Sequence, residues 1–281
     1  MKILRIVGVI GAAALGLTSC TASSVPAEVT AEQTAPEQTP AIDLLPLAAL
    51  PDYQLGGSYD PGADVQIVVR DRLNPPDPDR YSICYVNGFQ TQPTELDFWP
   101  ANTLLTNEAG PVADPDWPDE VLLDTSTAEK RAQIRAVLEP WIQGCATSGY
   151  SAVEFDNLDS YTRSDGALSK TDNMELAVDL VAFAHAQGLA AGQKNAAEDA
   201  AELKPQAGFD FAVSEECAAY DECSAYTGVY GDQVIDIEYT DQLPRSFASM
   251  CADESAPASM ILRDRDLVTP TEDAYHFERC A

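Results

Sequence analysis

Runs of apolar and β-branched residues recur along the chain from residue 65 onward, each about as long as a strand and most of them ending at a polar residue. Their length and composition predict strands. The eight predicted strands are Val65–Arg70, Tyr81–Asn87, Glu120–Asp124, Ala152–Asp156, Leu189–Lys194, Phe209–Glu215, Val234–Tyr239 and Met260–Arg263.

Between several of these runs, apolar residues return every three or four positions, which is the period of an amphipathic helix. The clearest helices are predicted at Thr127–Cys145 and Asp172–Gln187, each with a glycine close to its end that suits a chain reversal. Shorter helices are predicted at Glu198–Lys204, Ala218–Thr227, Leu243–Ala252 and Glu272–Glu278.

Strands and helices that alternate through residues 51–281 predict an α/β fold, and eight strands predict a single-domain (β/α)8 TIM barrel. The first half departs from the regular pattern, because the turn-rich segment Gln92–Trp117 stands where a helix would be expected. A barrel gathers its functional side chains at the carboxyl ends of its strands. We therefore expect the functional residues at the carboxyl ends of the predicted strands.

Residues 1–19 predict a lipoprotein signal peptide, because Lys2 and Arg5 precede an apolar run, ending at Leu17, that is too short to span a membrane. The sequence Leu-Thr-Ser-Cys at 17–20 resembles a lipobox, so we expect Cys20 to carry lipid; the alternative is an ordinary signal peptide with a nearby cysteine. Residues 20–50 are rich in Thr, Ala, Pro and Glu and predict a disordered, flexible tether. These features predict an exported cell-envelope lipoprotein whose only membrane contact is its lipid.

Six cysteines remain beyond Cys20, and an even number in an exported chain predicts three disulfides. Cys217 and Cys223 are close in sequence and are the most direct pair. The other four permit several connectivities, among them Cys84 with Cys145 and Cys251 with Cys280.

The composition is strongly acidic, with 46 Asp and Glu residues against 16 Lys and Arg residues and a net charge of -30. Such a surface repels phosphate, so nucleic acid is not an expected ligand. Two histidines are too few for a His-rich metal site, and the sequence has no G-x-S-x-G, P-loop or dinucleotide motif. We expect a monomer that uses no metal and no cofactor.

Carboxylates gather at the predicted strand ends, most densely in Val153–Asp159. Because side chains alternate along a strand, Glu154 and Asp156 project from the same face, and burying ionised acids is costly unless they serve a site. Polar residues also end other predicted strands: Asn87, Asp124, Lys194, Glu215, Glu216, Glu238, Tyr239 and Arg263. Two acids placed across a glycosidic bond can divide the work of cleaving it, so the pattern favours a glycosidase.

Six motifs, in order along the chain, resemble those of glycoside-hydrolase family 114, the endo-α-1,4-polygalactosaminidases and their relatives. They are CYVNGFQTQP at 84–93, DEVLLD at 119–124, VEFDNLDSY at 153–161, GQKN at 192–195, FDFAVSEECAAYDEC at 209–223 and IEY at 237–239. The resemblance runs from about Tyr53 to Arg265 and implies a TIM barrel that cleaves galactosamine-containing polysaccharide, a cationic polymer where it is deacetylated. It also implies an Asp after the fourth predicted strand and a Glu after the sixth as the catalytic pair.

Carried onto this sequence, the pair is Asp156 and Glu215, with Glu216 as the alternative to Glu215. The hypothesis is retaining cleavage with Asp156 as nucleophile and Glu215 as acid/base, and the reverse order stays open. The residues expected to bind sugar are Tyr85, Asn87, Asp124, Glu154, Asp159, Lys194, Asn195, Glu216, Tyr220, Glu238 and Tyr239. The alternatives to an enzyme are a carbohydrate-binding lipoprotein that does not cut and a structural envelope protein.

Overall fold

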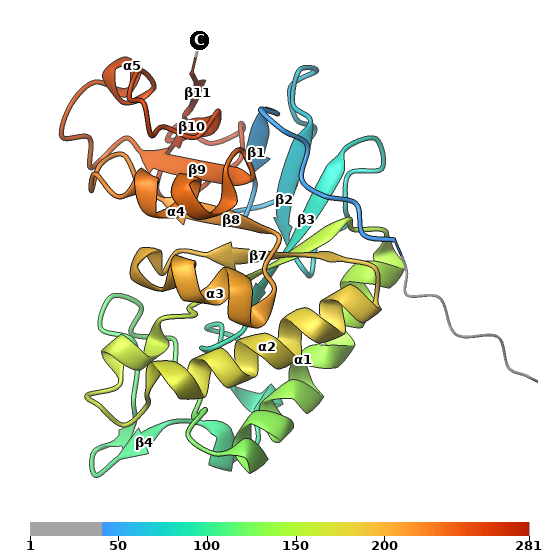
Figure 1. Cartoon of the computed structure of the whole chain (residues 1–281), viewed down its shortest axis with the longest axis vertical. Helices are drawn as coiled ribbons and strands as arrows, with labels where there is room; N and C mark the ends of the chain where they lie inside the picture. Colours follow the sequence, from blue (N-terminus) through green and yellow to red (C-terminus); the bar gives the residue numbers. More distant parts are fainter. Residues whose placement is uncertain (1–40, 281) are drawn as a thin grey trace, which may run out of the picture. The chain divides into compact units, whose positions relative to one another are not determined.

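Eight parallel strands form a curled sheet, and a ninth strand, β11, is added antiparallel at one edge (Figure 1). The computed structural model describes residues 41–280, so the predicted signal peptide, Cys20 and most of the predicted tether lie outside the described residues. In sheet order the strands are β1 Pro51–Tyr53, β2 Ile67–Asp71, β3 Tyr81–Asn87, β6 Ala152–Asp156, β7 Ala190–Lys194, β8 Phe211–Glu215, β9 Val234–Tyr239, β10 Ser259–Arg263 and β11 Phe277–Arg279. The predicted α/β class is confirmed, and the curled parallel sheet is consistent with a TIM-barrel-like fold.

The helices follow the third to seventh strands of the sheet, from β3 to β9. They are α1 Ala128–Ser148, α2 Lys170–Ala186, α3 Ala200–Ala207 and α4 Cys223–Tyr230, with a short α5 at Phe247–Met250, and they pack side by side from α1 to α4 (Figure 1). The α1 helix begins where the Thr127 hydroxyl accepts from the Lys130 N–H, and α2 begins at a capping box of Ser169 and Asp172. The regular eight helices of a complete (β/α)8 barrel are not formed by the described residues.

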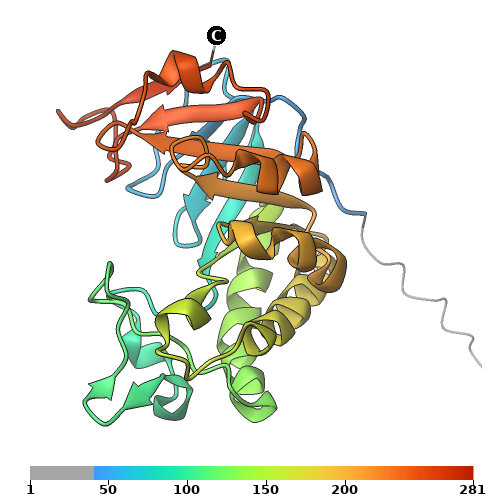
Figure 2. The same ribbon diagram turned by 60° about the vertical axis from the view of Figure 1, so that its left-hand side comes forward.

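The segment between β3 and α1, residues 88–124, forms an arm that continues from the carboxyl end of β3 (teal to green in Figure 2). It contains short 3-10 turns at Leu96–Phe98 and Ala101–Thr103 and the small hairpin of β4 Thr106–Asn107 and β5 Gly110–Pro111. The strand predicted at Glu120–Asp124 is wrong, because Val121, Leu122 and Leu123 make isolated antiparallel bridges within this arm. Their apolar side chains are buried there rather than in the parallel sheet.

The eighth parallel strand is β1, which the hydrophobic pattern does not reveal because it has three residues and begins with proline. It pairs with β2 in parallel, with Pro51 opposite Ile67. The helix predicted at Glu272–Glu278 is also wrong. That segment ends in β11, which pairs antiparallel with β10.

The two faces of the sheet build two apolar clusters. Inward-facing side chains such as Ile67, Ile83, Phe211 and Ile237 fill the interior of the curl, while outward-facing ones such as Phe155 pack against the helices. In β7 a Cβ on Gly192 would lie 2.4 Å from the ring of Phe211, so only glycine leaves room for that ring inside the curl. This close packing supports the strand ends from below.

The described part of the predicted tether is folded. Leu45 and Ala49 lie within the predicted tether, but both are buried in the inward-facing cluster. Packing therefore begins before residue 51. Among the described residues, no helix has the length and apolar character needed to cross a membrane.

Three disulfides join Cys84 to Cys145, Cys217 to Cys223 and Cys251 to Cys280. The first ties β3 to the end of α1, and the second holds the loop between β8 and α4. The third fixes the residue after β11 to the residue after α5. The predicted pair of Cys217 with Cys223 is confirmed, and so are the two pairs that the sequence left open among several.

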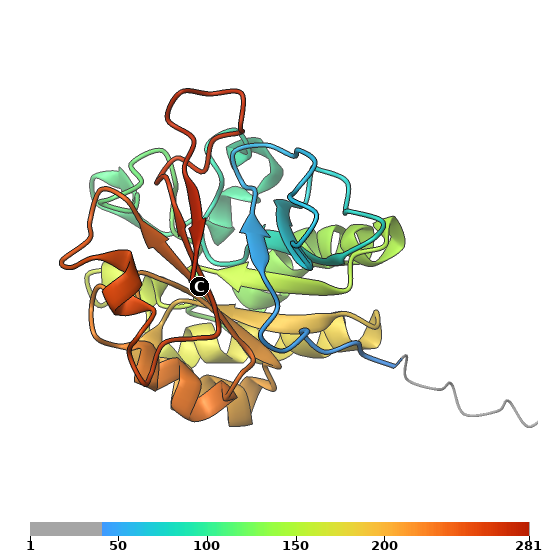
Figure 3. The same ribbon diagram turned by 90° about the horizontal axis from the view of Figure 1, so that it is seen from above.

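The first and last parallel strands meet at a seam that has no backbone ladder between β1 and β10 in residues 41–280 (Figure 3). The buried guanidinium of Arg263 bridges it by donating to the Tyr53 carbonyl and lying 3.3 Å from Asp52 Oδ1. The same guanidinium donates to the carbonyls of Val268 and His276. Arg263, expected at a strand end, thus joins β10 to β1.

Candidate active site

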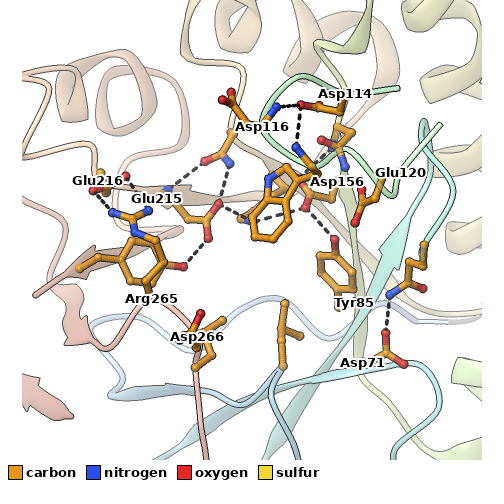
Figure 4. Close-up of a pocket in the computed structure, with 18 of the residues that line it drawn as sticks. Asp71, Tyr85, Asp114, Asp116, Glu120, Asp156, Glu215, Glu216, Arg265 and Asp266 are labelled. Carbon is orange, nitrogen blue, oxygen red and sulfur yellow. Dashed lines mark hydrogen bonds and ion pairs between the residues drawn. The ribbon is translucent and has the colours of Figure 1, made fainter. Parts of the chain in front are cut away.

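A cavity of about 510 Å³ opens at the carboxyl ends of the parallel strands. Side chains from the ends of β2, β3, β6, β7, β8 and β9 line it, together with the loops after β1 and β10 and part of the arm (Figure 4). Eight predicted site residues line it: Tyr85, Asp156, Asp159, Lys194, Asn195, Glu215, Glu216 and Tyr239. The cavity is where the fold brings the predicted chemistry together.

Asp156 ends β6 on the inward face, as strand alternation predicted. The Tyr85 hydroxyl donates to its Oδ2 at 2.8 Å, and the Asn157 N–H donates to its Oδ1 at 2.8 Å. Asn157 has φ of +66°, a conformation that asparagine tolerates better than most residues. That turn aims its backbone N–H at the carboxylate and fixes the orientation of Asp156.

Glu215 ends β8 across the cavity from Asp156 (Figure 4). Asn195 Nδ2 donates to its Oε2 at 2.9 Å, Lys194 Nζ lies 2.9 Å from the same oxygen, and the Tyr239 hydroxyl donates to Oε1. Burial raises the pKa of Glu215, but the charge of Lys194 and these donors outweigh it and lower the pKa to about 2. Glu215 is therefore ionised at neutral pH.

Lys194 is the buried cation between the two acids. Its Nζ lies 3.6 Å from Asp156 Oδ2 and 2.9 Å from Glu215 Oε2, so these two oxygens are at most about 6.5 Å apart, the sum of the two distances. Burial lowers the pKa of Lys194, but the opposing charges of Asp156, Glu215 and Glu154 raise it above its usual value. The side chain therefore stays charged while being 2% exposed.

Glu154 lies below Asp156 on the same inward face and is fully buried. The Tyr53 hydroxyl donates to its Oε1 at 2.7 Å. Burial raises its pKa to about 8, although Lys194 and the Tyr53 hydroxyl oppose that shift. Glu154 does not line the cavity, so its side chain is not placed where the sequence analysis expected it to bind sugar.

Glu216 also faces the cavity but has a different partner. Arg265 Nη2 lies 2.7 Å from Glu216 Oε1, and its Nη1 donates to Oε2 at 3.3 Å. The same guanidinium pairs with Asp241 and lies over the Tyr239 ring at 4.4 Å. The charge of Glu216 is therefore neutralised by Arg265, whereas Glu215 is the acid that faces Asp156 across Lys194.

The arm supplies the opposite wall of the cavity with acids and one aromatic ring. Asp114 pairs with Arg163 at 2.7 Å, and Arg163 also pairs with Asp159 at 3.0 Å, which ties the arm to the loop after β6. Burial raises the pKa of Glu120 to about 7, although side-chain donors oppose the shift. The Trp117 side chain, from the same part of the arm, is 60% exposed.

Four further residues expected to bind sugar do not line the cavity. Asp124 pairs with Lys130 at the start of α1, because the segment before it belongs to the arm rather than to a sheet strand. Tyr220 is 58% exposed outside the cavity, and Glu238 faces outward from β9 and accepts from the Ala218 and Ala219 N–H groups. Asn87 lies behind the wall and donates to Glu120. The structure therefore does not place these four among the cavity residues, where the sequence analysis expected them.

The cavity also contains residues that the sequence analysis missed. The charged and aromatic ones are Asp71, Asp114, Asp116, Trp117, Glu120, Arg163, Arg265 and Asp266. Asp114–Trp117 lies in the turn-rich segment that replaces a helix. Long connections often carry binding residues, so the acidic and aromatic residues of this segment could have been predicted to reach the site. Arg265 and Asp266 directly follow the last predicted strand end and were within reach of the same reasoning.

Among the described residues, one cluster has the donor types of a metal site: Cys217, Cys223 and Asp236. The two sulfurs are joined in a disulfide, so neither is a thiolate ligand. The donor set does not fit a metal ion.

Residues 31–281 match the sequence model of the glycoside-hydrolase family GH114. The chain belongs to this family. A glycoside hydrolase is a glycosidase, so the enzyme class predicted from the carboxylates is confirmed, and the cavity is the candidate active site of a GH114 protein. No curated protein sequence matches the chain at a significant level.

Two solved structures show the same fold. One is Aspergillus fumigatus Ega3 in complex with galactosamine, with 22% identity, coverage of 88% of this chain and 99% of that chain, and a TM-score of 0.68. The other is the glycoside hydrolase domain of PelA from Pseudomonas aeruginosa, with 14% identity, coverage of 79% and 96%, and a TM-score of 0.54. The GH114 chain described here therefore spans nearly the whole of both.

Proposed function

We propose that this GH114 protein cleaves α-1,4-linked galactosamine-containing polysaccharide by a retaining mechanism in which Asp156 and Glu215 are the catalytic pair. The observation that carries the proposal is that Lys194 pairs with both acids, which limits the distance between Asp156 Oδ2 and Glu215 Oε2 to about 6.5 Å. Retaining enzymes hold their two carboxyl groups roughly 5–5.5 Å apart, while inverting enzymes need roughly 6.5–9.5 Å to admit a water. Because about 6.5 Å is the largest possible distance between these two oxygens, they cannot be farther apart than the lower edge of the inverting range, which favours a retaining mechanism.

The charges around the pair bear on how the two acids divide the work. A nucleophile must be ionised, and the general acid of the first step must carry a proton. Glu215, with a pKa of about 2, is ionised in the free protein, which favours it as nucleophile and Asp156 as acid/base. This is the reverse of the order first hypothesised from the sequence.

Azide rescue separates the two orders. In a retaining enzyme acting on α-linked sugar, azide restores an alanine variant of the nucleophile by giving a β-glycosyl azide, and it restores an acid/base variant by giving an α-glycosyl azide. We expect β-azide from Glu215→Ala and α-azide from Asp156→Ala, read by proton NMR of the products. The opposite pattern would return the roles to Asp156 as nucleophile.

The charge of the cavity supports an amino-sugar polymer as substrate. Nine acidic side chains line it against three basic ones, Arg163, Lys194 and Arg265, and two of these basic residues are each paired to acids of the wall. A polymer that carries free amino groups is positively charged at neutral pH and is attracted to such a surface. The similarity to Ega3, whose structure contains galactosamine, supports the same sugar.

The location proposed for the enzyme is the cell envelope, where Cys20 would anchor it by lipid and residues 21–40 would serve as the tether. The three disulfides support export, because such bonds persist in oxidising compartments. An anchored glycosidase would act on polymer at the cell surface.

The function is tested by incubating the protein with an α-1,4-linked galactosamine polymer and with its fully N-acetylated form. We expect oligosaccharides of several lengths from the deacetylated polymer by mass spectrometry, and an α-anomer as the first product by NMR. Binding of the polymer without any shortening would instead assign a carbohydrate-binding protein that does not cut. A β-anomer as first product would assign inversion.

Trp117 is expected to hold one sugar of the polymer by stacking on its ring face. Its backbone N–H donates to Asp114 Oδ1 at 3.3 Å, and Asp114 is held by Arg163, so the backbone that carries the exposed ring is held in the arm. Trp117→Ala should raise KM for polymer by roughly fivefold, which corresponds to about 1 kcal/mol of lost aromatic contact. Phe98→Ala is the matched control, because Phe98 is an equally exposed aromatic residue of the arm outside the cavity. Equal KM values in the two variants would exclude the stacking role.

A further inference from the structure

A buried carboxyl group lies beneath the catalytic pair and makes no contact with the cavity. Glu154 is fully buried on the inward face of β6, opposite Gly192 of β7. Its Oε1 accepts one hydrogen bond, from the Tyr53 hydroxyl at 2.7 Å, and its Oε2 is buried without a hydrogen-bond partner among the described residues. A carboxylate buried with so few donors is costly, so the neutral acid is the form that this place stabilises.

The groups that face Glu154 come from five strands and include one cation. They are Tyr53 of β1, Tyr85 of β3, Asp156 of β6, Lys194 of β7 and Glu215 of β8. Lys194 makes ion pairs with Asp156 and Glu215, and within residues 41–280 its Nζ makes none with Glu154. One positive charge is thus balanced by two carboxylates when Glu154 is neutral, and it would be shared among three if Glu154 ionised.

We propose that Glu154 is a positioning residue whose uncharged carboxyl keeps Lys194 paired with Asp156 and Glu215, and whose ionisation ends activity at alkaline pH. The proposal rests on the proposed function of the Asp156–Glu215 pair. Loss of the proton from Glu154 would place a third negative charge below Lys194 and draw the ammonium away from Glu215, whose ionised form it stabilises. Burial raises the pKa of Glu154 to about 8, which places this change just above neutral pH.

The test is the pH dependence of kcat/KM on galactosamine polymer for the full protein and for Glu154→Gln, each profile scaled to its own maximum. Glutamine keeps the shape of the side chain and cannot ionise. We expect the wild-type profile to fall near pH 8 and the fall in Glu154→Gln to move upward by at least one pH unit. Tyr53→Phe removes the donor that stabilises the ionised form, so its profile should keep the fall but move it to higher pH.

Asp236→Asn is the matched control. Asp236 is another fully buried strand acid whose pKa is raised well above its usual value by burial, but it faces outward from β9 and is hydrogen-bonded to Ser214 rather than placed below Lys194. Its alkaline limb should coincide with that of the wild type. An unchanged limb in Glu154→Gln, or an equal shift in Asp236→Asn, would overturn the proposal.

A stability measurement separates this proposal from the proposed function. The folded-state pKa of Glu154, about 8, lies above its ordinary value of 4.5, so the stability that comes from holding the neutral acid is complete below pH 4.5 and is lost as the pH rises to about 8. The melting temperature of Glu154→Gln should therefore gain on that of the wild type through this window and level off above it. If this gain appears while the alkaline limb stays fixed, Glu154 is neutral but has no role in positioning Lys194. If the wild type cleaves no polymer at all, the proposed function fails and the positioning role fails with it, whatever the melting curves show.

Discussion

Asp156→Asn and Glu215→Gln are each expected to lower kcat on galactosamine polymer by roughly 10³-fold or more, because each removes a group that acts on the reacting bond. The two substitutions keep the size of the side chain. The Asp156 variant retains a contact to the Tyr85 hydroxyl through its remaining oxygen, and the Glu215 variant keeps Asn195 as a neighbour, so both should stay folded. Glu215→Gln should nevertheless melt somewhat lower than the wild type at neutral pH, because it loses the ion pair with Lys194. Steady-state kinetics and thermal melting of the two variants check the expectation together.

Asp124→Asn is the control for both variants. It removes a carboxylate that the strand pattern assigned to the site and that the structure places at the start of α1, paired with Lys130. Its kcat should stay within about twofold of the wild type, because Asp124 neither lines the cavity nor pairs with Lys194. Substantial turnover in Asp156→Asn or Glu215→Gln would remove that residue from the catalytic pair.

Lys194→Met should lose both activity and stability. Without the ammonium, the carboxylates of Asp156 and Glu215 face each other uncompensated, and breaking a buried ion pair in this way typically costs about 3 kcal/mol or more. The pKa of Glu215 should rise from about 2, so the ionised carboxylate proposed as the nucleophile is less stabilised. A fall in kcat of roughly 10²-fold or more is expected, with a clear drop in melting temperature at pH 7.

The drop in melting temperature of Lys194→Met should depend on pH, because it reflects the ionisation of Glu215. In the wild type the lowered pKa of Glu215 contributes stability that is present above its ordinary value of 4.5 and is lost as the pH falls toward about 2. The difference in melting temperature between the wild type and Lys194→Met should therefore be largest near neutral pH and shrink below pH 4.5. Lys204→Met is the matched control, because Lys204 also lies over a tyrosine ring but donates to a backbone carbonyl rather than to the pair. A constant difference across this range would contradict the electrostatic cause.

The parts of the site that strand periodicity could predict are those carried by strands. Alternation placed Glu154 and Asp156 on one face, and the ends of β7 and β8 placed Lys194 and Glu215 at the same rim. Largely apolar runs of four to seven residues identified seven of the eight parallel strands, because strands buried on both faces are rich in apolar residues.

The errors have a common physical origin in the connections. Val121–Leu123 has the composition of a buried strand, and nothing in its pattern distinguishes antiparallel bridges in the arm from a place in the parallel sheet. That error carried Asp124 into the predicted site. Trp117 and Arg265 reach the cavity only because particular loops fold over the strand ends, which depends on contacts distant in sequence such as Asp114 with Arg163.

The seam beside β1 has a consequence for how the chain is made. The edge of β10 that a closed barrel would offer to β1 is occupied by β11, and β11 is held in place through the bond between Cys251 and Cys280. A growing chain therefore contains its first strand long before it contains the residues that complete the sheet. Local helix pairs can form earlier, but the final packing must wait until residues 277–280 have been synthesised.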